Sequence, residues 1–86
     1  MRISTHRNFE RQVKKLRVSE QRRLIQRLEL FRADPNSPIL NNHALKGRGE
    51  GHFSINITGD IRAIYRLPQK DVALFLKVDT HSNLYS

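Results

Sequence analysis

The fold of this chain is decided by the stretch FSINITGDIRAIY, residues 53–65, in which two apolar runs flank a turn sequence. Alternate residues from Phe53 to Ile57 are apolar and their neighbours are polar, which is the pattern of a strand with one buried face. Thr58-Gly59-Asp60 provides turn residues before the second run, which extends from Ile61 to Leu67. The stretch therefore predicts a β-hairpin.

The residues that follow extend this hairpin into a larger sheet. The run from Ile61 to Leu67 is apolar on both faces, as expected for a central strand. Pro68-Gln69-Lys70-Asp71 has turn composition and leads into a third apolar run, Val72 to Val78. We therefore expect a three-stranded antiparallel meander.

The first part of the chain predicts a short strand and a helical hairpin. In residues 1–5 the apolar Ile3 alternates with polar neighbours, which predicts a short strand at the sheet edge or beside a partner strand. Ser19 is a plausible N-cap for the second helix, which ends before Asp34-Pro35. The predicted order is β-α-α-β-β-β in one α+β domain, residues 1–86, with both helices on one face of the sheet. The apolar positions of the two helices are Phe9, Val13 and Leu16, followed by Leu24, Ile25, Leu28 and Phe31.

Charge and composition restrict the class of function. Sixteen Lys and Arg against eight Asp and Glu give a net charge of +8, which suits nucleic-acid phosphates or an acidic protein partner. The chain has no cysteine and its four histidines are scattered, so we expect metal-free chemistry with no cofactor. No apolar run is long enough to span a bilayer and no secretory signal is recognisable, so we expect no membrane association and a cytoplasmic location.

The end of the chain combines several groups that are useful in chemistry. The third apolar run contains a single charge, Lys77, and is followed by Thr80-His81-Ser82 and Tyr85. A histidine held at the end of a rigid strand suits proton transfer. The simpler interpretations are an unremarkable terminal histidine and, for Lys77, a lysine that protects a sheet edge.

Other candidates lie in the loops of the sheet half. Asp60 follows the hairpin turn, Arg62 is two residues further on, and His43 precedes a glycine-rich loop. Taken singly these are a turn former, a solvated arginine and an exposed loop histidine. Together with Lys77 and His81 they could converge on one face. RNA cleavage without metal needs a base, cations around the phosphoryl group and an acid, and this set supplies each role.

Three ordered motifs resemble a known family. The patterns are His43-x-Leu-x-Gly, then Gly59-Asp-x-Arg-x-Ile-Tyr, then Thr80-His-Ser-x-Leu-Tyr. They resemble bacterial toxins of the RelE/ParE superfamily, particularly the YafQ-like branch of messenger-RNA interferases. The resemblance implies a RelE-like fold and a ribosome-dependent endoribonuclease that cuts messenger RNA. It also implies an acidic antitoxin that neutralises the toxin, in a toxin-antitoxin hetero-oligomer.

The same resemblance assigns residues by position. His81 corresponds to the principal catalytic histidine, Asp60 to the acidic active-site residue and His43 to the loop histidine. Lys77 stands where a relative has an arginine, and Tyr85 where it has a phenylalanine. Two positions depart from the pattern, because Asn56 occupies the place of a strand histidine and Ile61 that of a tryptophan. An asparagine cannot exchange protons near neutral pH, so the base is His43 or Asp60.

These observations predict a toxin of a type II toxin-antitoxin system in which His81 is the general acid. Lys46, Arg62 and Lys77 are expected to neutralise phosphate and Tyr85 to stack on a base. Two alternatives keep the fold: a ParE-type inhibitor that binds DNA gyrase, and an inactive relative that binds RNA or antitoxin. The basic helix residues expected to dock on ribosomal RNA are Lys14, Lys15, Arg17, Arg22, Arg23 and Arg27.

Overall fold

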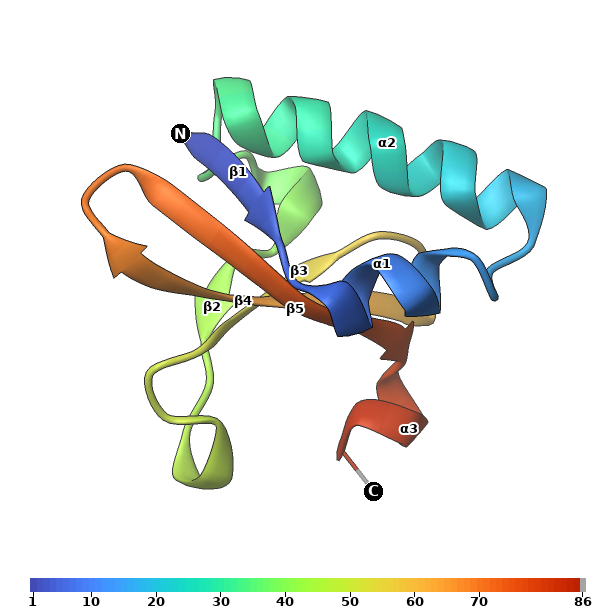
Figure 1. Cartoon of the computed structure of the whole chain (residues 1–86). Helices are drawn as coiled ribbons and strands as arrows, with labels where there is room; N and C mark the ends of the chain where they lie inside the picture. Colours follow the sequence, from blue (N-terminus) through green and yellow to red (C-terminus); the bar gives the residue numbers. More distant parts are fainter. Residues whose placement is uncertain (86) are drawn as a thin grey trace.

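The computed structural model describes the backbone of residues 1–85 and the side chains of residues 1–84. Within this part of the chain, one five-stranded sheet carries two helices on one face and a short helix below the other (Figure 1). The elements are β1 (Arg2–Thr5), α1 (Arg7–Val13), α2 (Val18–Ala33), the 3-10 turn η1 (Pro38–Leu40), β2 (His43–Ala44), the 3-10 turn η2 (Gly47–Gly49), β3 (Phe53–Asn56), β4 (Ile61–Gln69), β5 (Val72–Thr80) and α3 (His81–Tyr85).

The sheet confirms the predicted α+β class and the meander of β3, β4 and β5. Its strand order is β1-β5-β4-β3-β2, and β4 is the central strand as expected. β1 lies at one edge and pairs with β5 in parallel, whereas the other strand pairs are antiparallel. β1 pairs with β5 only as far as Phe75, so Lys77 lies on the part of β5 whose outer edge β1 does not cover, and the interpretation of it as an edge-protecting lysine stays a prediction.

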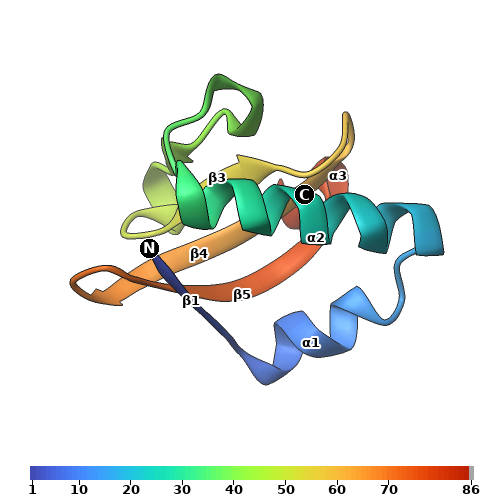
Figure 2. The same cartoon turned by 90° about the horizontal axis from the view of Figure 1, so that it is seen from above.

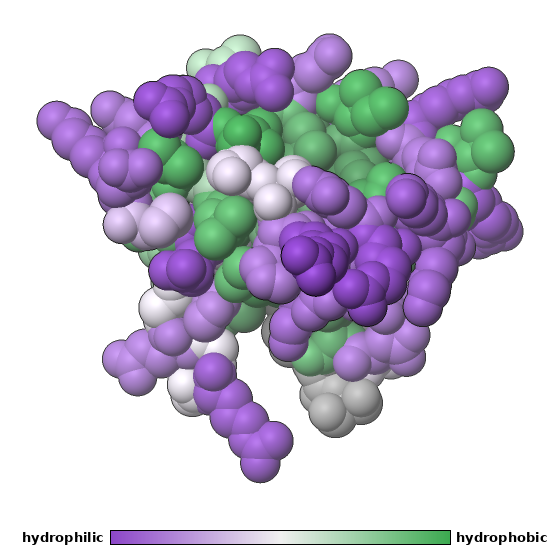
Figure 3. Space-filling model, in the orientation of Figure 1, coloured by the Kyte–Doolittle hydropathy of each residue, from purple (hydrophilic) through white to green (hydrophobic). Residues whose placement is uncertain are grey.

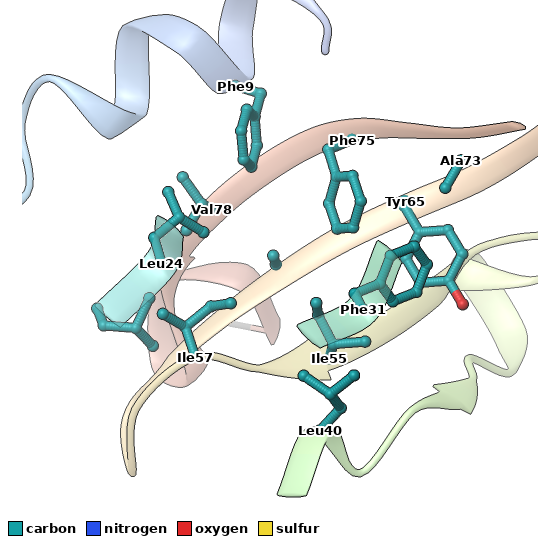
Figure 4. Close-up of a cluster of buried hydrophobic side chains, with 12 residues drawn as sticks. Phe9, Leu24, Phe31, Leu40, Ile55, Ile57, Tyr65, Ala73, Phe75 and Val78 are labelled. Carbon is teal, nitrogen blue, oxygen red and sulfur yellow. The ribbon is translucent and has the colours of Figure 1, made fainter. Parts of the chain in front are cut away.

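The core lies between the sheet and the helices α1 and α2, and Figure 2 shows α2 running over the strands while α1 lies beside β5. Phe31 of α2 meets Tyr65 of β4 and Phe75 of β5, with ring centroids 5.0 and 5.4 Å apart (Figure 4). Phe9 of α1 contacts the Phe75 ring at 5.7 Å. Such ring pairs each contribute about 0.5–1.5 kcal/mol beyond the area they bury. The aromatic cluster therefore fixes both helices onto one face of the sheet.

The start and solvent face of α2 differ from the prediction. The helix begins at Val18 with Arg17 as its N-cap residue, so Ser19 lies inside the first turn. The Arg17 backbone N–H donates to Glu20 Oε1 at 2.9 Å, and this hydrogen bond lowers the pKa of Glu20. Ile25, expected in the apolar stripe, is 58% exposed, because successive helix residues point about 100° apart and Leu24 takes the core position.

The C-terminal strand also ends later than expected. β5 continues to Thr80 and is followed directly by α3, so His81 is the first residue of a helix and not the end of a strand. Thr80 Oγ1 accepts from the Asn83 N–H at 3.2 Å, which satisfies one of the free N–H groups of the first helical turn. None of the described helices is long and apolar enough to cross a membrane.

Candidate active site

A cavity of about 610 Å³ lies on the sheet face opposite α1 and α2. The loop after β2 forms one wall, β4 and β5 form the floor, and α3 contributes to the other wall. Figure 1 shows the loop and α3 on the same side of the sheet, and Figure 3 shows the notch beside the projecting loop. The cavity is lined by Leu45, Lys46, Arg48, Gly49, His52, Ile64, Leu76, Lys77 and Leu84.

The loop wall, residues 45–52, is closed by backbone hydrogen bonds and shaped by glycine. The Leu45 N–H donates to the His52 carbonyl, and the His52 N–H donates to the Gly49 carbonyl, both at 2.9 Å. A Cβ at Gly49 would lie 2.7 Å from the Leu45 Cβ, closer than such atoms approach. Gly51 has a φ of +87°, which favours glycine. The loop therefore holds its side chains in a defined shape beside the floor.

A β-bulge places the lysine of the floor. Ile64 pairs with Lys77, but the next residue of β4, Tyr65, pairs with Phe75, so Leu76 is an extra residue in β5. At a bulge the alternation of side chains is interrupted. Leu76 and its neighbour Lys77 consequently both line the cavity, while Phe75 remains in the core.

The charge and apolar surface of the cavity suit a nucleotide. Lys46 and Arg48 from the loop and Lys77 from the floor supply three cations, and no carboxylate is among the described lining residues. Ile64, Leu76 and Leu84 add apolar surface on which a base can pack. No group of three metal-ligating side chains occurs among the described residues. The cations can thus hold a phosphate while the apolar side chains contact a base.

Two of the predicted residues, Asp60 and His81, meet at the turn between β3 and β4. The His81 N–H donates to the Asp60 carbonyl at 2.8 Å, which ties the start of α3 to the turn between β3 and β4. Thr58 Oγ1 shapes this turn by accepting from the Asp60 and Ile61 N–H groups. Arg62 Nη1 donates to the Thr58 carbonyl at 2.9 Å and to the Gly59 carbonyl at 3.2 Å. Arg62 therefore supports the turn.

Of the five residues expected to converge on one face, only Lys77 lines the cavity, together with Lys46 of the loop. His43 lies at a separate hollow of about 300 Å³ beside Phe53 and Tyr65. Asp60, Arg62 and His81 are not among the cavity's lining residues, although Leu84 of the same helix as His81 is. The side chain of Tyr85 lies outside the described residues, so its role stays a prediction.

Sequence reasoning overlooked two residues of the cavity, Arg48 and His52. A signal for His52 exists, because it stands two residues before Ser54 and four before Asn56 and so shares their side of an extended chain. Ser54 Oγ and Asn56 Oδ1 are themselves buried and have no hydrogen-bond partner within the described part of the chain. The cavity therefore combines three cations with one histidine, His52.

The fold is that of RelE-like toxin structures. The model of the family described as "Bacterial toxin of type II toxin-antitoxin system, YafQ" matches residues 1–86. The chain therefore belongs to the YafQ family of bacterial toxins. No curated protein matches it in sequence.

Solved structures of several toxins share the fold. YafQ from E. coli strain BL21(DE3) is 20% identical with a TM-score of 0.82, and the alignment covers 100% of both chains. A metal-bound toxin from Helicobacter pylori is 21% identical with a TM-score of 0.77 and covers 99% of both chains. YafQ in the E. coli DinJ-YafQ toxin-antitoxin complex is 20% identical with a TM-score of 0.79, covering 98% of this chain and 96% of that one. These likenesses establish the fold.

Proposed function

We propose that this toxin is an endoribonuclease that cleaves messenger RNA on the ribosome in the cytoplasm by metal-free acid–base catalysis. The observation that carries the proposal is the cavity on the open sheet face. It combines the cations of Lys46, Arg48 and Lys77 with an apolar surface, and a histidine-bearing helix forms part of its wall. Cations stabilise the charge that grows on a phosphoryl group, and apolar side chains accept a base.

The residues have the following proposed roles. His81 protonates the leaving 5′-oxygen, because histidine can donate a proton near neutral pH and His81 begins α3, whose Leu84 lines the cavity. Lys46 and Lys77 neutralise the phosphate, Asp60 helps to position His81 through the turn, and Tyr85 stacks on a base. Arg62 contributes positive charge while it holds the turn.

The helix surface suits a large RNA. Of the predicted docking residues, Arg27 is half-buried and its Nε donates to the Ile57 carbonyl at 3.3 Å, so it serves the fold. The others are exposed and project from α2 and from the segment between α1 and α2, where charge can attract ribosomal phosphates without reading sequence. They are Lys14, Lys15, Arg17, Arg22 and Arg23.

An acidic antitoxin is the proposed partner that silences the protein. The E. coli YafQ structure with DinJ shows a relative bound to its antitoxin. The net charge of +8 and the cations of the cavity give an acidic segment a place to dock, by charge pairing across the open face. Occupation of the cavity by carboxylates excludes RNA phosphates from the same cations.

The test is single-turnover cleavage of ribosome-bound messenger RNA by the wild type and by His81→Ala. Loss of a general acid lowers the rate by about a hundredfold to ten-thousandfold. The free energy of unfolding should change by no more than about 1 kcal/mol, since His81 is exposed. Parallel reactions without ribosomes measure the dependence on the ribosome.

His6→Ala is the matched control. His6 is an exposed histidine whose Nδ1 accepts from the Asn8 N–H at 3.0 Å at the start of α1, so its loss affects helix capping and not cleavage. If the wild type cleaves nothing, or if His81→Ala cleaves as fast as the wild type, the catalytic proposal fails. Inhibition of gyrase by the wild type would then establish the ParE-type function.

A further inference from the structure

We propose that His52 is the general base that removes the proton from the attacking 2′-hydroxyl, an assignment that rests on the proposed endoribonuclease function. The first reason is its position. Among the described residues, His52 is the only histidine that lines the cavity, and it shares the lining with Lys46 and Lys77. A base must lie beside the phosphate that its nucleophile attacks, and these lysines are the groups placed to hold that phosphate.

The second reason is that the backbone of His52 is fixed. Its N–H donates to Gly49 and its carbonyl accepts from Leu45, both at 2.9 Å, so the residue closes the loop wall on both sides. A catalytic group needs such support, because small displacements reduce the rate strongly. The loop is also tethered to the sheet, since β2 and β3 pair directly before and after it.

The third reason is the orientation of the imidazole. His52 Nδ1 lies 3.4 Å from the carbonyl oxygen of Glu50. A carbonyl can only accept, so this long contact favours the tautomer with the proton on Nδ1 and leaves the lone pair on Nε2 to accept a proton. His6 has the opposite arrangement, because its Nδ1 accepts from the Asn8 N–H.

The geometry also separates base from acid. His52 is on the loop wall, whereas His81 opens the helix that contributes to the other wall through Leu84. In-line displacement at phosphorus puts the attacking and leaving oxygens on opposite sides of the phosphate. Proton acceptor and proton donor are therefore needed on opposite sides. Besides the three lining cations, the charged group nearest in sequence to His52 is Glu50, in the same loop.

The reaction balances without any co-reactant. His52 Nε2 takes the 2′-hydroxyl proton as O2′ forms a bond to phosphorus and the bond from phosphorus to O5′ breaks. His81 gives its proton to O5′. The products are a 2′,3′-cyclic phosphate and a 5′-hydroxyl, and exchange with water returns both histidines to their starting states.

The test compares His52→Gln with His6→Gln in single-turnover cleavage of ribosome-bound messenger RNA. We expect His52→Gln to lose about a hundredfold to ten-thousandfold in rate. His6→Gln changes an exposed histidine at the start of α1 that does not line the cavity, so its rate should stay within a few-fold of the wild type. Thermal melts check that both variants fold. Added imidazole should partly restore His52→Ala, which a purely structural role would not permit.

A modified substrate distinguishes base from acid. Sulfur in place of O5′ at the cleavage site leaves without protonation, so it should restore most of the rate lost in His81→Ala and none of that lost in His52→Gln. Wild-type rates in His52→Gln, or recovery of His52→Gln by the sulfur substrate, would overturn the assignment and leave the endoribonuclease function standing. An inactive wild type would instead overturn the proposed function and this assignment together.

Discussion

The two faces of the sheet are built from alternate residues of the same strands and differ in nearly every property. On the face beneath α1 and α2, Ala63 and Phe75 are fully buried and Tyr65 is 3% exposed, all in one aromatic cluster. On the other face, Ile64 and Lys77 line a cavity with a cationic wall. Alternation within single strands thus separates the core from the candidate site.

The difference teaches how a small chain can keep like charges close together. Lys46, Arg48 and Lys77 share one cavity, and the repulsion among such groups opposes folding. The covered face offsets that cost through dense aromatic packing that contains no charge. Substitutions on the covered face should therefore change stability, and those on the open face should change RNA binding and cleavage.

The largest effect on stability is expected from Phe31→Ala. Phe31 is fully buried and its ring meets those of Tyr65 and Phe75. Removal of such a ring leaves a cavity and lowers the free energy of unfolding by about 3–5 kcal/mol. The total free energy of unfolding of a protein domain is only about 5–15 kcal/mol, so the variant should be close to unfolding. Urea denaturation followed by circular dichroism measures the loss.

Ile25→Ala is the control for this prediction. Ile25 belongs to the same helix but is 58% exposed, and its removal should change the free energy of unfolding by no more than about 0.5 kcal/mol. Equal losses in Phe31→Ala and Ile25→Ala would show that α2 is not oriented with Phe31 in the core.

A smaller effect on stability is expected from Gln12→Ala, at the place where α1 meets the outer edge of β5. β1 stops at Thr5, and further along β5 the Val78 N–H donates to Gln12 Oε1 of α1 at 2.9 Å. Gln12→Ala removes this acceptor from a partly buried N–H group, which costs about 1–3 kcal/mol. Gln12→Glu keeps an acceptor oxygen and should lose less. Hydrogen exchange at the Val78 amide measures the bond directly, and unchanged protection in Gln12→Ala would contradict it.

The parts of the fold that the sequence predicts are those set by local pattern. Alternation around Ile55 and the turn at Thr58-Gly59-Asp60 are enough to place the hairpin and its central strand. The first turns of α2 and α3 are each capped by a side chain, since Glu20 accepts from the Arg17 N–H and Thr80 accepts from the Asn83 N–H. A sequence pattern offers several capping residues and does not decide among them.

The same distinction applies to the candidate site. A basic loop and a lone charge in an apolar strand are visible in the sequence, and Lys46 and Lys77, both expected to neutralise phosphate, line the same cavity. Their shared cavity nevertheless depends on the bulge at Leu76 and on the close approach of Gly49 to Leu45. These features arise from tertiary packing, which is why the sequence alone does not show that His52 lines the same cavity as the two lysines.

The smallest effect on stability, and a direct test of the open face, is expected from Lys77→Gln. The side chain is exposed, so the free energy of unfolding should change by no more than about 0.5 kcal/mol. RNA binding should weaken, and the slope of log affinity against log salt should become shallower by about 1. The variant makes one phosphate contact fewer, so fewer counterions are released on binding. Anisotropy of a labelled RNA oligomer across a salt series measures both quantities.

Lys70→Gln is the matched control, since Lys70 is an exposed lysine between β4 and β5 that does not line the cavity. It should leave the salt slope nearly unchanged. If both lysine variants lower the slope equally, RNA is bound by the whole basic surface. The contrast between the two faces would then describe stability alone and would not locate RNA in the cavity.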